Sequence, residues 1–364
     1  MRILIDARTA SDRFPGVGRY ISSLTRALRP IAKGHELLLL KQRGQPQSEL
    51  ELPDLRVVEC TSGPLSLSQQ WAVRSVVAST RADLYFSPYV LVPYWPGVPS
   101  VVVCHDVIPL TCPQFFPLHT RAAFRLAYRV GFRRATAIIV SSDATRADLV
   151  AHYPDIARKI TVVHLASDLA DARPAASPPR FARPDRYVLY VGSNRPHKNL
   201  ARLISAWTRL VEAGAHAGCH LVIAGPVDQR FALPDDAASH TAGTSVTWLG
   251  RVSDDALREL YRHAALFVFP SVAEGFGLPP LEAMSFGTPV ACSNIPTMSE
   301  VALGAAALFD PFDVADIAET LSRLLQTPDE LARLAAAGRQ RAAHFSWNRT
   351  ARETLSVLEH AGAA

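Results

Sequence analysis

Short apolar runs alternate with longer amphipathic segments along the whole chain. Short runs bounded by turn-forming residues are typical of buried strands, and the segments between them are long enough for crossover helices. We therefore predict parallel sheets covered by helices, for example helices over 19–28 and 120–134. The predicted strands are 2–5, 37–40, 56–58, 84–86, 101–104, 137–140, 160–163, 187–191, 220–224, 246–249, 266–269 and 289–291.

The alternation is interrupted by residues 171–186, which contain four prolines and few side chains that could form a core. Proline removes a backbone donor and disfavours helix and sheet, so this segment is predicted to be a linker. A chain of 364 residues is long enough for two domains. The predicted fold class is α/β, with two doubly wound, Rossmann-like parallel-sheet domains, 1–170 and 187–346. They are expected to face a cleft at the carboxyl ends of their strands.

The most informative local pattern follows the predicted strand 266–269. Gly275 and Gly277 lie in the next loop, where glycine lets backbone N–H groups approach a ligand closely. A helix is expected to begin at Pro279 or Pro280, because a proline in the first turn costs no hydrogen bond. The N-terminus of this helix would add partial positive charge, which suits a phosphate.

Two glutamates belong to the same pattern. Glu274 lies on the loop and Glu282 in the first turns of the expected helix, so both can line one pocket. Carboxylates accept hydrogen bonds from neighbouring hydroxyls, as recognition of a sugar requires. The alternative is an ordinary turn followed by an acidic residue at a helix start.

Glu274 and Glu282 together resemble the E-x7-E motif of glycosyltransferase family 4, which has the GT-B fold, and the resemblance extends over nearly the whole chain. It implies that Glu274 contacts the hydroxyls of the donor sugar and that Glu282 holds the ribose of the nucleotide. It also implies a retaining reaction that needs no metal and no other cofactor. The amides expected to meet the sugar and the diphosphate are those of Gly275, Phe276, Gly277 and Leu278.

A second motif follows the predicted strand 187–191. Arg195 and Lys198 lie in this loop, and two cations at a strand end can neutralise a diphosphate without a metal. Lys198 matches the lysine that the family places here. Many members have an arginine where this chain has Ser193, so Arg195 is expected to substitute for it. Ser193 and Asn194 are further candidate binding residues, and a solvated basic loop is the alternative.

His105 directly follows the predicted strand 101–104. A lone histidine after an apolar strand is commonly a satisfied core residue. The sequence His105-Asp106-Val107-Ile108-Pro109, however, resembles a subgroup of the family in which this histidine lies near the donor sugar. We therefore predict a catalytic role for His105 and expect Asp106 either to orient the imidazole or to cap the next segment.

Gly16 and Gly18 follow the first predicted strand in a Gly-x-Gly pattern. A dinucleotide-binding fingerprint would need a third glycine where Ile21 stands and an acidic residue near Lys41, so an NAD-dependent oxidoreductase is disfavoured. The family uses such a loop to approach the donor diphosphate from the first domain.

Arg251 and Val252 resemble the family's loop beside the nucleotide base, and the stretch 293–311 resembles its closing segment. The last helix, about 347–364, resembles the one that packs back on the first domain.

Basic residues exceed acidic ones by five, which is too small a surplus for a nucleic-acid-binding protein. Five scattered cysteines without a CxxC pair fit a reducing compartment. The sequence offers no signal peptide and no run that could span a bilayer, so we expect a cytoplasmic protein.

The segment 120–134 also carries arginines at helical spacing beside aromatic residues. These arginines predict peripheral contact with anionic lipid or with a lipid-diphosphate. The plainer interpretation is that they form a solvated helix face. The arginines are Arg121, Arg125, Arg129, Arg133 and Arg134.

The combined motifs resemble GDP-mannose-dependent mannosyltransferases of O-antigen and exopolysaccharide assembly. The prediction is transfer of a hexose, with mannose from GDP-mannose as the first choice, to a saccharide or a polyprenyl-diphosphate-linked acceptor. A UDP-sugar-dependent transferase, an epimerase of the same fold and a non-catalytic sugar-nucleotide binder are the alternatives. The two-glutamate loop argues against the epimerase, and the presence of Glu274, Lys198 and His105 argues against the mere binder.

Overall fold

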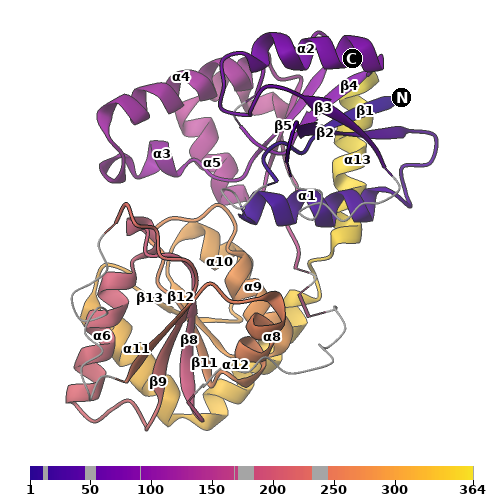
Figure 1. Cartoon of the computed structure of the whole chain (residues 1–364). Coiled ribbons are helices and arrows are strands. Elements are labelled where there is room, and N and C mark those ends of the chain that lie inside the picture. Colours follow the sequence, from indigo (N-terminus) through magenta and orange to yellow (C-terminus); the bar gives the residue numbers. More distant parts are fainter. Residues whose placement is uncertain are drawn as a thin grey trace. The chain divides into compact units, whose positions relative to one another are not determined.

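The computed structural model describes residues 1–10, 15–45, 55–90, 92–167, 169–170, 184–231 and 245–363. Most of the predicted linker, residues 171–183, lies outside these ranges. The chain divides into two compact units (Figure 1). The N-terminal unit comprises Met1–Leu165 and Ser346–Ala364, and the C-terminal unit comprises Ala166–Phe345.

The N-terminal unit contains a parallel sheet with the strand order β3-β2-β1-β4-β5-β6-β7. Its inner strands β1, β4, β5 and β6 are buried along most of their length, as expected where helices cover both faces of a sheet. The strands are β1 Arg2–Asp6, β2 Glu36–Gln42, β3 Arg56–Cys60, β4 Leu84–Ser87, β5 Ser100–Cys104, β6 Ala137–Val140 and β7 Ile160–Val162.

Helices α2, α4 and α5 share one hydrophobic core with this sheet, whereas α1 packs against the C-terminal helix α13. The helices are α1 Pro15–Leu28, α2 Gln69–Thr80, α3 Ile108–Thr111, α4 Leu118–Arg134, α5 Asp143–His152 and α13 Trp347–Ala363, with short 3₁₀ turns at Pro113–Phe115 and Pro154–Lys159. The Thr350 hydroxyl of α13 donates to the carbonyl of His164 at 2.8 Å, which ties the end of the chain to this unit.

The C-terminal unit contains a second parallel sheet, with the order β10-β9-β8-β11-β12-β13. Its strands are β8 Tyr187–Val191, β9 His220–Ala224, β10 Val246–Gly250, β11 Leu266–Phe269, β12 Val290–Ser293 and β13 Ala307–Phe309. Its helices are α6 Leu200–Glu212, α8 Asp254–His263, α9 Leu278–Phe286, α10 Pro296–Ala302, α11 Val314–Gln326 and α12 Pro328–Ala342, with a 3₁₀ turn at Pro196–Lys198.

Side chains of β8 alternate between two hydrophobic cores. Val188 and Tyr190 pack with α6 and α11, while Tyr187 and Leu189 pack with α8 and α9. This period of two is what a strand buried on both faces requires. The predicted fold class, two Rossmann-like parallel-sheet domains, is confirmed.

Several predicted boundaries were wrong. Helix α1 begins at Pro15 rather than at residue 19, and β12 runs from Val290 to Ser293 rather than over 289–291. Pro279 and Pro280 lie inside the first turn of α9, which begins one residue earlier, at Leu278. Strand β13 was not predicted, because three residues are too few to show a period.

Candidate active site

The topology brings two loops of the C-terminal unit together. Strand β8 lies in the middle of its sheet, between β9, which follows it in the chain, and β11, which comes later. The loops that leave β8 and β11 therefore diverge at a topological switch point, where doubly wound sheets bind ligands. The two motifs predicted from the sequence occupy these loops.

Lys198 and Glu274 meet across the switch point. Lys198 Nζ donates to Glu274 Oε1 at 2.6 Å, although the residues are 76 positions apart in the sequence. Both side chains are partly buried, and the Lys198 ammonium also lies 5.4 Å from the centre of the Phe269 ring at the end of β11. The arrangement presents one cation and one carboxylate at the same strand edge, which suits a ligand with a diphosphate and a sugar.

The loop after β11 is shaped by Gly277. It caps α9 with φ 91°, and a Cβ at this position would lie 2.3 Å from Met298 Cε. Only glycine fits this conformation without strain. Gly275 and Phe276 are buried beside it, and Leu278 is the first residue of α9. The backbone N–H groups of Gly277 and Leu278 are consequently held at the edge of the sheet, whereas Pro279 and Pro280 in the first turn of α9 carry no N–H.

Glu282 lies on α9 and is only 3% exposed. Its Oε2 accepts a hydrogen bond from the Tyr261 hydroxyl of α8 at 2.9 Å. A buried carboxylate needs such partners because desolvation of the charge is costly. Glu282 is thus fixed in orientation by a neighbouring helix.

Asn194 and Arg195 point to the loop that follows β9. The Asn194 side chain donates to the carbonyls of Asp228 and Phe231 and accepts from the Asp228 amide at 2.7 Å. Arg195 pairs with the Asp228 carboxylate at 3.2 Å and is largely exposed. The structure therefore brings together Lys198 and Glu274, but gives Arg195 a different carboxylate partner.

Three other predicted binding residues of this unit lie in its loops. The carbonyl of Ser193 accepts a hydrogen bond from the Tyr190 hydroxyl at 2.9 Å. Arg251 and Val252 follow β10, which is an edge strand separated from β8 by β9. Arg251 is exposed and Val252 is partly buried.

In the N-terminal unit, His105 follows β5 and is held against its neighbours. Its Nε2 lies 3.0 Å from the carbonyl of Pro88, so Nε2 carries the hydrogen and Nδ1 is left as an acceptor. The ring also makes an edge contact with Tyr20, with centroids 4.8 Å apart. Burial lowers the pKa of His105 to about 4, and the imidazole is neutral at pH 7.

The Asp106 side chain bonds to the backbone of the segment that follows it. Its Oδ1 accepts the amide hydrogen of Ile108 at 3.1 Å, at the start of α3. Of the two predicted roles for Asp106, the structure thus favours the cap.

Gly16 and Gly18 were predicted to lie in a loop, and this is corrected by the structure. Both belong to the first turn of α1, and neither has a positive φ. A Cβ at Gly16 would meet no atom within 4 Å, so packing within the N-terminal unit does not require glycine at this position. The amides of this first turn still point out of the helix end.

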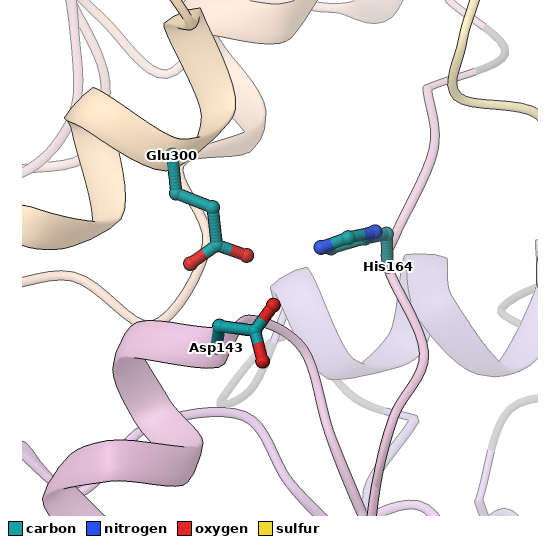
Figure 2. A group of neighbouring side chains, drawn as sticks. All are labelled: Asp143, His164 and Glu300. Atoms are coloured by element: carbon teal, nitrogen blue, oxygen red, sulfur yellow. The ribbon is translucent and has the colours of Figure 1, made fainter.

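A separate group of titratable side chains is labelled in Figure 2. Asp143 begins α5 and His164 follows β7, both in the N-terminal unit, whereas Glu300 belongs to α10 of the C-terminal unit. Within one unit this leaves only two metal-ligating side chains, fewer than a tight protein site supplies. We assign no metal to them.

Asn199 and Thr297 were not predicted as site residues. The Asn199 amide donates to the carbonyls of Pro270 and Pro311, which joins the loops after β8, β11 and β13, and the residue has φ 59°. The Thr297 hydroxyl donates to the carbonyl of Glu274 at 2.8 Å. Asparagine tolerates a left-handed backbone conformation. An asparagine directly after Lys198 was therefore the sequence feature that could have identified Asn199 as a site residue. Both residues hold the backbone around the Lys198–Glu274 pair.

Acid is expected to destabilise the protein through two histidines. Burial lowers the pKa of both His105 and His197 to about 4, below the unfolded value near 6.5. The unfolded state therefore binds more protons between these values, and the stability that the neutral rings contribute is complete above pH 6.5 and is lost as the pH falls toward 4. Urea unfolding at pH 7 and at pH 5 should differ by about 1–2 kcal/mol for each histidine.

His105→Gln keeps an N–H donor for Pro88 and cannot titrate, so it should remove about half of this difference. Equal stability of the wild type at the two pH values would contradict the assignment.

Two family models match consecutive parts of the chain. Residues 15–171 match "Glycosyltransferase Family 4", and residues 175–341 match "Glycosyl transferases group 1". O-antigen chain mannosyltransferase B of Escherichia coli is 30% identical over 302 residues, with 80% of this chain and 77% of that protein covered. The serotype-specific mannosyltransferase WbdA of Escherichia coli is 32% identical over 265 residues, covering 69% of this chain but only 32% of WbdA.

Solved structures agree with this fold. Sucrose-phosphate synthase from Thermosynechococcus elongatus superimposes with a TM-score of 0.79 at 19% identity, covering 100% of this chain and 99% of the other. Anabaena HepE in complex with UDP-glucose gives a TM-score of 0.75 at 20% identity, covering 98% of this chain and 100% of HepE. The two Rossmann-like units define the GT-B fold, and the family models together with the curated relatives define a transferase. The chain belongs to glycosyltransferase family 4.

Proposed function

We propose that the protein transfers mannose from GDP-mannose, with retention of configuration and without a metal, during synthesis of a cell-surface polysaccharide. The observation that carries the proposal is the Lys198–Glu274 contact at the switch point of the C-terminal sheet. In a chain that is 30% and 32% identical to two mannosyltransferases, this pair is the group best suited to hold a sugar diphosphate.

The proposed reaction is a front-face substitution. The acceptor oxygen forms a bond to the anomeric carbon as the bond from that carbon to the diphosphate oxygen breaks, and the acceptor proton passes to the departing phosphate. Glu274 accepts hydrogen bonds from the donor sugar, and Lys198 neutralises the charge that develops on the diphosphate. The amides of Gly275, Phe276, Gly277 and Leu278 add donors at the start of α9.

The same residues explain why a metal is not required in this proposal. Lys198 and the first turn of α9 place positive charge at one strand edge, which is the work a divalent cation would otherwise do. The proposal therefore expects donor binding to persist in a chelator such as EDTA.

From the N-terminal unit, we assign a role at the reacting sugar to His105 and a role at the diphosphate to the amides around Gly16 and Gly18. A neutral His105 offers Nδ1 as a hydrogen-bond acceptor for a hydroxyl, because Nε2 is engaged with Pro88. This assignment rests on the resemblance to the family.

UDP-hexoses are the second candidate donors. The favouring observation is that the structurally similar HepE was solved with UDP-glucose. Similarity at 20% identity supports a shared fold. The choice between a GDP-sugar and a UDP-sugar donor is tested by the binding measurements below. GDP-mannose remains the first choice because the more similar sequences are mannosyltransferases.

The proposed acceptor is a saccharide or a polyprenyl-diphosphate-linked saccharide in the cytoplasm. A reducing compartment fits the five cysteines, which are all free and buried. A lipid-linked acceptor would bring the enzyme into peripheral contact with the inner face of a membrane.

Calorimetry with GDP-mannose, other GDP-sugars, UDP-sugars and NAD, in the presence of EDTA, tests the proposal. Glu282→Gln keeps the shape of the side chain and an acceptor for Tyr261 but removes the charge, so it should weaken binding of the preferred nucleotide roughly tenfold to a hundredfold. Tyr261→Phe is the complementary control, because it removes the buried hydrogen bond that Glu282→Gln keeps and leaves the carboxylate.

Tight binding of one sugar nucleotide, weakened in Glu282→Gln and nearly unchanged in Tyr261→Phe, would support the proposal and name the donor. Binding of NAD alone, or of no nucleotide, would show that the two-glutamate loop has another use.

A further inference from the structure

Helix α4 of the N-terminal unit has two different faces. Its inner face is aromatic: Phe124, Tyr128 and Phe132 follow one another with ring centroids 5.6 and 5.3 Å apart, and Tyr128 and Phe132 are buried against the sheet. This face anchors the helix in the core of the unit, and α4 also contacts α3. The outer face is consequently fixed in its orientation relative to the unit.

The outer face combines arginines with exposed leucines. Leu118 is 77% exposed and Leu126 is 63% exposed, although leucine at a solvated face is ordinarily replaced by a polar residue. Arg125, Arg129 and Arg133 are exposed on the same helix. The helix contains five arginines and no acidic residue.

Most of this charge is not neutralised within the protein. Arg133 pairs with Asp155 at 2.6 Å, but no carboxylate of the described residues forms an ion pair with Arg125 or Arg129. At the end of the helix, the Arg134 guanidinium lies 5.2 Å from the centre of the Trp95 ring, and Trp95 is itself 50% exposed. An exposed tryptophan beside arginine is typical of groups that lie at a lipid headgroup layer.

We propose that the outer face of α4, together with Trp95, docks on the anionic headgroups of a lipid bilayer. The arginines meet the phosphates, and Leu118, Leu126 and the Trp95 ring enter the boundary between headgroups and acyl chains. A solvated face accounts for the arginines alone, whereas docking accounts for the arginines and for the two exposed leucines beside them. Contact is peripheral, since every helix of the described residues is too short or too polar to cross a membrane.

This inference extends the proposed function by naming the surface that would bring the enzyme to a lipid-linked acceptor, and its test does not depend on turnover. The full chain is sedimented with vesicles of phosphatidylcholine alone and with vesicles containing about 30% phosphatidylglycerol, at low salt and at about 0.5 M salt. Binding is expected only to the anionic vesicles and should weaken in salt.

Two variants separate the charge from the apolar contribution. Arg125→Glu with Arg129→Glu should weaken vesicle binding at least tenfold, because two attractive charges become repulsive. Leu126→Ser retains every charge and should weaken binding several-fold. The control, Arg209→Glu with Arg333→Glu, makes the same change in net charge at exposed positions of α6 and α12 and should bind like the wild type.

Failure of the wild type to bind anionic vesicles, or equal binding by the α4 variant and the control, would overturn the inference. Nucleotide calorimetry on the same samples distinguishes this result from a failure of the proposed function. The α4 variants should bind sugar nucleotide normally, and vesicle binding without nucleotide binding would refute only the transferase proposal.

Discussion

Glu274→Gln is expected to reduce sugar transfer by roughly a hundredfold to a thousandfold, because it removes the carboxylate proposed to contact the reacting sugar. The substitution preserves the shape of the side chain and an oxygen that can accept the hydrogen bond from Lys198. The surrounding loop should also persist, since Thr297 bonds to the backbone carbonyl of residue 274 and not to its side chain. The loss should therefore appear mainly in kcat, with a smaller change in donor affinity.

Steady-state transfer, or hydrolysis of the donor where the acceptor is unknown, measures this effect. Glu319→Gln, at an exposed position of α11, makes the same chemical change and is the control. Near-normal turnover of Glu274→Gln would refute the proposed role of this residue, whereas unfolding at lower temperature would indicate a structural role.

The sequence was sufficient to predict the sheets and the strand ends from which the site is built. Apolar runs such as Leu266–Phe269 are long enough to be recognised, and in a parallel sheet the following loops all lie at one edge. Glu274 and Lys198 can therefore be assigned to the same edge from the sequence alone. Their contact at 2.6 Å requires β8 and β11 to be adjacent in the sheet. This adjacency depends on the order of the strands, which the local sequence pattern does not reveal.

The details of the loops were less predictable. The partner of Arg195 is Asp228, which lies in a loop without any motif, and the joining of three loops by Asn199 depends on backbone carbonyls that have no sequence signature. The start of α1 was placed too late because two glycines near Pro15 resembled a turn. In physical terms, periodicity reports burial, whereas these features depend on tertiary contacts.

Arg195 illustrates the limit of transferring a motif. The family resemblance suggested that Arg195 and Lys198 together neutralise a diphosphate. In the structure, Asp228 accepts hydrogen bonds from both Arg195 and Arg230, and the hydrogen bond from Arg230 is the largest cause of a lowered pKa for the Asp228 carboxyl. The Lys198 ammonium is also paired with a carboxylate, that of Glu274, but this pair joins the loops after β8 and β11 at the switch point, whereas Arg195 points to the loop after β9. We therefore propose that Lys198 carries the main share of diphosphate neutralisation.

Lys198→Met is therefore expected to lower kcat by roughly a hundredfold to a thousandfold, which is the cost of losing a preorganised positive charge at a departing group. Methionine approximates the length and the apolar stem of lysine, and it preserves contact with the Phe269 ring. Donor affinity should fall less than kcat, because the charge on the diphosphate grows as the bond to the sugar breaks.

Lys198→Arg restores the charge with a different geometry and should recover part of the lost turnover. Lys33→Met, at an exposed position of the N-terminal unit, is the matched control for loss of one lysine. The thermal midpoint of each variant must be measured as well, since Lys198→Met leaves the partly buried Glu274 carboxylate without its partner. If Lys198→Met lowers stability while kcat stays within a few-fold of the wild type, the pair holds the two loops together and the positive charge at the diphosphate must come from another residue.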